Sequence, residues 1–153
     1  MGDQGQLSGE QWEALLHMPF GAYSTVAEAG EPAGEAQFRR FVEEIEAGRT
    51  TFAEGSTGAA LTDALAANLD TLWSAYHASG RSAQDVVKRG VRVLGKVPDA
   101  ESVAIRDWLL VMAVGVAAAT RVVSEPPVSW DEMFAIRDLA KLVKRPVPDI
   151  SQR

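Results

Sequence analysis

Acidic side chains beside two predicted turns are the first residues of this chain that could bind a ligand. Glu28 and Glu35 flank a glycine-proline turn, and Glu132 opens a helix that follows a second, proline-rich turn. Hard cations such as Ca²⁺ and Mg²⁺ take carboxylate oxygens from such turns, so these three residues are candidate metal ligands. Acidic residues in a first helical turn also simply complement the helix dipole. Both interpretations stay open, and no cofactor is predicted.

Other groups that could carry catalysis are few. The two histidines, His17 and His77, belong to neither a Glu-x-x-His nor a His-Glu-x-x-His pattern, which argues against di-iron and zinc sites of those kinds. Cysteine is absent, so thiolate catalysis and sulfur-ligated metals are excluded. Gly-x-Ser-x-Gly, P-loop and Gly-x-Gly-x-x-Gly patterns do not occur. We therefore expect that the chain is not an enzyme.

Basic residues recur at helical spacing in one segment, at Lys88, Arg89, Arg92 and Lys96. They could hold phosphate groups or an acidic partner, including the acidic N-terminal half of another copy. The first 63 residues carry eleven acidic and three basic side chains, and the formal charge of the whole chain is −6. Because nucleic-acid binding needs more clustered positive charge, we expect no nucleic-acid partner. The simpler interpretation of the row is a solvated helix face.

The element that must organise these residues is an uncharged segment from Trp108 to Thr120, rich in small side chains in its second half. A helix that is apolar all round has to be surrounded by other helices, and small residues let their backbones come close. At about 20 Å the segment is too short to span a bilayer, so no membrane association is expected. The sequence predicts a buried central helix over about residues 99–123.

Five further helices are predicted around it from apolar residues at helical spacing. The first begins at a Ser8–Gln11 capping box and contains Pro19, and the second covers about 33–47 and ends at Gly48. A single third helix ends at Gly80, a fourth starts after Ser82, and the last runs from about Trp130 to Val143. A polar loop is expected at 48–57. The prediction is an all-α, single-domain bundle of about six helices over residues 8–145, with flexible tails at 1–7 and 146–153.

Two similar half-patterns suggest a family. Val26-Ala27-Glu28-Ala29-Gly30 leads to Gly34-Glu35, and Val116-Ala117-Ala118-Ala119 leads to Ser129 and Glu132. The chain in this respect resembles the TerB-like tellurite-resistance helical family, over roughly residues 8–145. The resemblance implies an all-α fold and divalent-metal binding. Glu35 and Glu132 stand at the matching positions, with Glu28 as a displaced third.

These observations favour a cytoplasmic, non-enzymatic helical module that acts through protein–protein contacts or self-association. The family resemblance implies a link to stress or tellurite resistance. The N-terminus lacks a basic stretch followed by an apolar run, which argues against a secretory signal. One alternative is a bundle that binds a divalent metal or a small ligand, through the turn carboxylates or a gap among the small residues of the central helix. A second alternative is an enzyme whose site no motif reveals.

Overall fold

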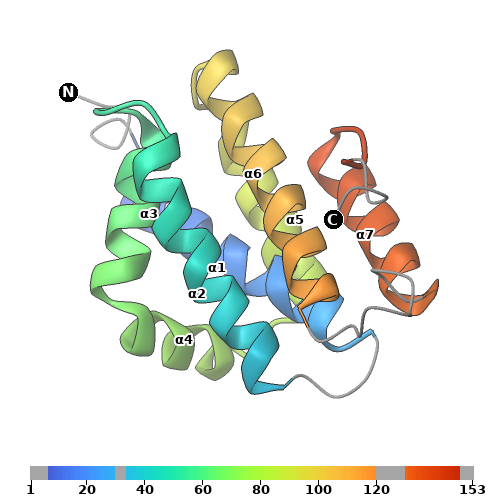
Figure 1. Cartoon of the computed structure of the whole chain (residues 1–153). Coiled ribbons are helices and arrows are strands. Elements are labelled where there is room, and N and C mark those ends of the chain that lie inside the picture. Colours follow the sequence, from blue (N-terminus) through green and yellow to red (C-terminus); the bar gives the residue numbers. More distant parts are fainter. Residues whose placement is uncertain (1–6, 30–33, 120–129, 149–153) are drawn as a thin grey trace.

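The structure is a computed structural model that describes residues 7–29, 34–119 and 130–148. Within those ranges it contains seven α-helices and no strand, so the predicted all-α bundle is confirmed (Figure 1). The helices are α1 (Gly9–Ala27), α2 (Glu35–Thr51), α3 (Thr57–Ala67), α4 (Leu69–Ala78), α5 (Ala83–Leu94), α6 (Asp99–Ala118) and α7 (Trp130–Val143).

The helix N-termini that have a local capping signal lie where the sequence predicts them. At the start of α1 the Gln11 amide donates to Ser8 Oγ (3.1 Å), and the Ser8 amide donates to Gln11 Oε1 (2.9 Å). This is the predicted capping box, which satisfies two backbone donors that the first turn leaves free. Ser82 caps α5 in the same way by accepting from the Asp85 amide at 3.1 Å. Pro19 lies inside α1, which continues past it to Ala27.

The predicted third helix is two helices, which is why the described chain has seven rather than about six. The break is at Asn68, whose backbone leaves the helical region (φ −129°, ψ 30°). The Asn68 amide and side-chain Nδ2 both donate to the Ala64 carbonyl, at 3.1 and 3.3 Å. The change of direction carries α4 across the lower end of the bundle (Figure 1), where Trp73 and Tyr76 reach Phe20.

Helix α2 is longer than predicted, because Gly48 does not end it. A Cβ at Gly48 would lie 2.8 Å from Thr62 Cγ2 and 3.2 Å from Trp108 Nε1. The glycine therefore allows α3 and α6 to approach α2, and the helix continues to Thr51 with Phe52 as its C-cap. The predicted loop at 48–57 shortens to residues 52–56 between α2 and α3.

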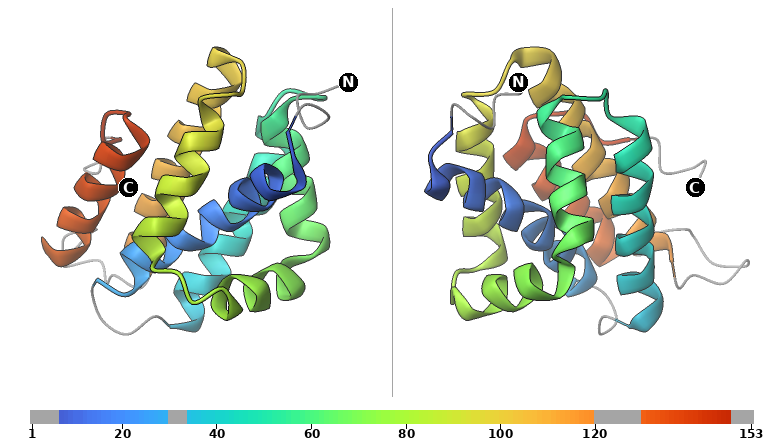
Figure 2. Two further views of the ribbon diagram at one scale, coloured as in Figure 1. Left: turned by 180° about the vertical axis from the view of Figure 1, so that it is seen from behind. Right: turned by 90° about the vertical axis from the view of Figure 1, so that its left-hand side faces the viewer.

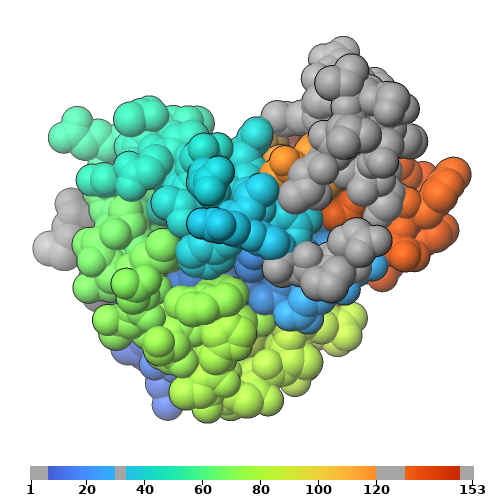
Figure 3. All heavy atoms as spheres, turned by 60° about the horizontal axis from the view of Figure 1, so that its bottom comes forward, coloured from blue at the N-terminus to red at the C-terminus, as the bar shows by residue number. Residues whose placement is uncertain are grey.

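One hydrophobic core draws residues from all seven helices. Every residue of α6 from Leu109 to Ala117 except Val111 is buried, as the uncharged segment predicts. Helix α1 shares the centre, since thirteen of its nineteen residues are buried and it contacts α3, α4, α5, α6 and α7. Figure 2 shows it crossing the bundle, and in Figure 3 it emerges between α2, α4 and α5.

Aromatic rings fill the part of the core between α1, α2 and α4. Phe20 lies 5.6 Å from Phe41, and Tyr23 lies 4.8 Å from the same ring, as measured between centroids. Trp73 of α4 packs 5.3 Å from Phe38 of α2. These edge-to-face and stacked contacts fix the short helix α4 against the two longer ones.

Some predicted features lie outside the described residues. They are the end of the central helix at 120–123, the proline-rich turn at 126–127, Ser129 of the second half-pattern, and most of the two tails. The described part of α6 ends at Ala118.

Candidate functional site

The three carboxylates predicted as metal ligands do not come together. Glu28 is exposed at the C-cap of α1. Glu35 is exposed in the first turn of α2, with its Oε1 3.8 Å from Arg39 Nη2. Glu132 is buried in the first turn of α7, with 3% of its surface exposed. Among the described residues no three His, Asp or Glu side chains form a group that could hold a metal ion.

Glu132 belongs instead to a contact between three helices. Gln37 Nε2 of α2 donates to Glu132 Oε2 of α7 and to the Val116 carbonyl of α6, both at 3.3 Å. Gln37 is itself 3% exposed. Buried polar groups are costly unless hydrogen-bonded, so this shared donor links α2, α6 and α7 in one arrangement. The contact is structural.

A second polar contact fixes the distance between α2 and α6. Arg40 Nε donates to Glu44 Oε2 at 2.9 Å, and Trp108 Nε1 donates to the Glu44 carbonyl at 3.1 Å. Gly115 of α6 lies against this ion pair, since a Cβ there would be 2.9 Å from Glu44 Oε2 and 3.0 Å from Arg40 Nε. A side chain at Gly115 would therefore collide with this ion pair.

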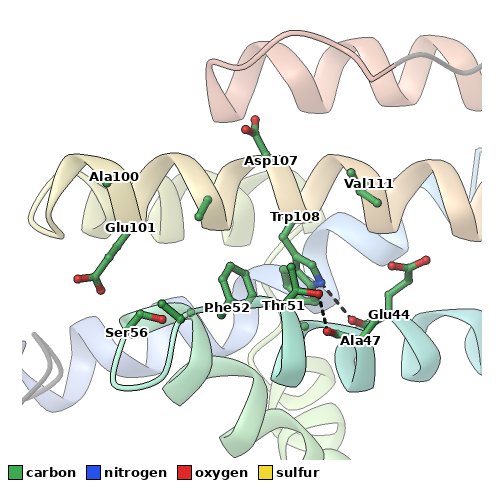
Figure 4. Close-up of a pocket in the computed structure, with 14 residues that line it drawn as sticks. Glu44, Ala47, Thr51, Phe52, Ser56, Ala100, Glu101, Asp107, Trp108 and Val111 are labelled. Atoms are coloured by element: carbon green, nitrogen blue, oxygen red, sulfur yellow. Dashed lines mark hydrogen bonds between the residues drawn. The ribbon is translucent and has the colours of Figure 1, made fainter.

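Beside this contact the two helices diverge and leave an apolar groove of about 470 Å³ (Figure 4). The groove lies between the C-terminal half of α2, the segment that leads to α3, and the N-terminal half of α6. Phe52 and Trp108 lie against each other in it, with ring centroids 6.0 Å apart. The lining residues are Glu44, Ala47, Gly48, Thr51, Phe52, Ala53, Ser56, Gly58, Ala100, Glu101, Ala104, Asp107, Trp108 and Val111.

The charged residues that line the groove are all acidic: Glu44, Glu101 and Asp107. Glu44 is paired with Arg40, and Asp107 Oδ1 lies 2.7 Å from Arg145 Nε. Glu101 Oε1 accepts from the Thr57 amide at 2.7 Å, at the N-terminus of α3, and no cation pairs with it among the described residues. Glu101 is therefore the carboxylate that gives the edge of this apolar groove an uncompensated negative charge.

The sequence did not predict this groove. The predicted alternative was a gap among the small residues of the central helix, but in the structure these residues, from Ala113 through Ala117, are buried against other helices. The groove instead lies along the N-terminal half of α6, at Ala100 and Ala104. Their i, i+4 spacing puts two small side chains on one exposed face of the helix. The spacing of these two alanines was the sequence signal that could have indicated the groove. It indicates a groove only when α2 lies opposite, and the sequence alone does not predict that position of α2.

The predicted basic row lies on α5 and, at Lys96, just after it, opposite the start of α1. Lys88, Arg92 and Lys96 are exposed and Arg89 is half-buried. A smaller hollow of about 190 Å³ separates this row from α1, and Glu10 forms part of its wall. The row therefore faces an acidic helix end within the same chain, which fits a solvated face that balances the acidic half.

The two histidines have different surroundings. His17 is buried on α1, with its ring 6.4 Å from Tyr76. Burial lowers the pKa of His17, Glu13 opposes this shift, and Arg81 and Arg89 add to it. His77 is exposed on α4 and packs edge-on against Trp73, with 4.3 Å between ring centroids.

Comparison with known proteins finds no matching family model, no matching curated protein and no matching solved structure. In the described ranges, no helix has both the length and the apolar character that crossing a bilayer requires. The candidate site therefore depends on the geometry alone, and the α2–α6 groove is the site that we consider further.

Proposed function

We propose that the chain is a non-enzymatic, cytoplasmic helical module that binds a protein segment in the α2–α6 groove. The observation that carries the proposal is the groove itself, an apolar hollow of about 470 Å³ with an acidic edge. The bound segment is an amphipathic helix with aromatic anchors and neighbouring Lys or Arg side chains. The resemblance to the TerB-like family adds a stress-linked setting to this proposal.

The groove has the features that helix-binding surfaces use. Such surfaces hold the apolar face of a helix through anchor side chains at i, i+3, i+4 and i+7. Aromatic anchors dominate the energetics of interfaces, and they bind best in pockets from which water is excluded. The apposed Phe52 and Trp108 rings give an incoming aromatic side chain a surface for edge-to-face contact.

Charge supports the same class of partner. The groove lining contributes three carboxylates and no Lys, Arg or His, and among the described residues Glu101 is the one of the three that no arginine pairs with. An acidic edge favours a cationic segment and disfavours an acidic one, because complementary charge speeds encounter and like charge opposes it. We therefore expect binding to weaken as salt concentration rises.

A peptide-binding measurement tests the proposal. The probe is a fluorescein-labelled amphipathic helical peptide with Trp and Phe four residues apart and Arg and Lys on the same face. We expect saturable binding by fluorescence anisotropy. Ala104→Trp places a large side chain in the groove and should weaken binding at least tenfold, which is about 1.4 kcal/mol.

The matched control is Val103→Trp. Val103 is the neighbouring residue of α6, is 37% exposed and does not line the groove. This variant should bind the peptide as the unchanged chain does. Equal weakening by both variants, or no saturable binding by the unchanged chain, would contradict the proposal.

A small apolar ligand is the second candidate occupant. The volume of the groove falls within the range of about 300–1,000 Å³ typical of small-molecule sites. Native mass spectrometry of the purified chain, with and without added Ca²⁺, Mg²⁺ or Zn²⁺, separates the candidates. A bound organic mass favours the small ligand, and bound metal ions favour the metal-binding alternative.

A further inference from the structure

The outer face of α7 carries two exposed aromatic side chains. Trp130 is 74% exposed and Phe134 is 53% exposed, and their ring centroids are 6.3 Å apart. Arg137 and Lys141 are also exposed. The spacing of four, three and four residues puts all four side chains on one side of the helix. We call this set the α7 outer face.

This face is unusual within the described chain. The other large exposed hydrophobic residues there are the two valines Val103 and Val147, each 37% exposed. The opposite side of α7 is buried against the bundle through Ile136, Leu139 and Val143. An exposed aromatic pair on a helix whose other side is fully packed is typical of an interaction surface.

We propose that the α7 outer face of one copy docks in the α2–α6 groove of a second copy. The inference rests on the proposed function and names its partner. Trp130 and Phe134 supply two aromatic anchors four residues apart, and the groove supplies an apolar hollow of about 470 Å³ with aromatic rings at Phe52 and Trp108. The α7 outer face therefore has the aromatic spacing expected of the bound segment.

A cationic pair on α7 can meet the unpaired carboxylate of the groove. Arg137 and Lys141 follow the aromatic pair on the α7 outer face, and the exposed Asp138 lies between them in the sequence. Glu101 stands at the edge of the groove without a paired cation among the described residues. Docking would place positive side chains next to this carboxylate and add an attractive charge contact to the apolar one.

The docking has to be between copies. Helix α7 packs against α1, α5 and α6. In Figure 4 it lies beyond α6 from the groove. Arg145, just after α7, holds Asp107 of α6 through two hydrogen bonds of 2.7 and 3.2 Å. With α7 fixed on that side, its outer face cannot enter the groove of its own chain, whereas a second copy can present it.

Sedimentation equilibrium of the full chain over a series of concentrations tests this inference. We expect reversible self-association that Ala104→Trp weakens at least tenfold through the groove. The double substitution Trp130→Ser, Phe134→Ser should weaken it equally through the α7 outer face. Val103→Trp and Val147→Ser, at exposed apolar positions outside both surfaces, should leave it unchanged. Thermal melts by circular dichroism check that each variant is folded.

Mixing the two defective variants tests directly whether the two surfaces bind each other. The chain with both serine substitutions keeps an intact groove, and the Ala104→Trp chain keeps an intact α7 outer face. The mixture should therefore form a heterodimer at a concentration at which each variant alone is monomeric. A mixture that stays monomeric, or self-association that persists in both variants, would overturn the inference.

The peptide assay separates this inference from the proposed function. A chain that is monomeric at every concentration but binds the labelled peptide in the groove overturns self-association and leaves the groove as a binding site. A chain that neither self-associates nor binds the peptide overturns both.

Discussion

Gly115 of α6 lies directly against side chains of α2. A side chain there would meet Glu44 Oε2 at 2.9 Å and Arg40 Nε at 3.0 Å. Those two atoms form a partly buried ion pair on the surface of α2. A side chain at Gly115 would therefore have to displace this ion pair.

Gly115→Leu should destabilise the chain by about 1–3 kcal/mol through overpacking. The free energy of unfolding, measured by urea titration, checks this value. Gly9→Leu is the control, because no atom lies within 4 Å of a Cβ at that exposed position. If the Gly115→Leu and Gly9→Leu variants have equal stability, the close approach of α2 and α6 at Gly115 is wrong.

His17 gives the fold a pH dependence of predictable sign. Burial lowers its pKa below the ordinary value of 6.5, with Arg81 and Arg89 acting in the same direction and Glu13 against it. Near pH 6.5 the unfolded chain therefore binds more protons than the folded chain. Stability should fall as the pH is lowered from above 6.5 towards the folded-state pKa of His17.

Replacing His17 with Gln should remove this part of the pH dependence. Urea titrations between pH 7.5 and 5.5 should show the unchanged chain losing more stability on acidification than His17→Gln. His77 is present in both chains and cancels in the comparison. Parallel pH profiles, or a steeper loss in the variant, would show that burial of His17 does not disfavour its charged form.

At the scale of the helices, the sequence predicted correctly those helix ends that depend on residues within one turn. Ser8 and Ser82 were identified as caps because a side-chain oxygen three residues before a free amide acts within one turn. The end of α7 at Val143 also agrees with the prediction.

Elements that depend on distant contacts were predicted less well. Gly48 has the character of a helix end, yet it lies inside α2 because Thr62 and Trp108 occupy the space its missing side chain leaves. Asn68 breaks one apolar stripe into α3 and α4, so that Trp73 can reach Phe20. Neither feature follows from spacing along the chain.

The candidate site shows the same limit. The acidic residues Glu28, Glu35 and Glu132 have the right chemistry for a cation, but the fold keeps them apart and buries Glu132 beside Gln37. The groove arises from Ala100 and Ala104, which have no chemistry of their own. Small residues become a binding surface only when a second helix lies opposite at a suitable distance.

For the whole molecule, the two proposals describe a bundle with complementary surfaces on different helices. The groove has α2 on one side and α6 on the other, and the α7 outer face points away from the core. A surface that binds a different surface on the next copy can form closed pairs or longer assemblies, depending on the rotation between copies. The mixing experiment isolates one such contact from any further assembly.

The most direct test of the central claim is an amide NMR titration of the isotopically labelled double-Ser chain with the amphipathic peptide. This chain keeps the groove intact and cannot offer its own α7 outer face. We predict that peptide-induced shift changes concentrate at groove residues such as Thr51, Ala53 and Ala104, and that an added Ala104→Trp substitution abolishes them. Shift changes centred on the basic row of α5, or changes that survive Ala104→Trp, would contradict the assignment of the α2–α6 groove as the binding surface.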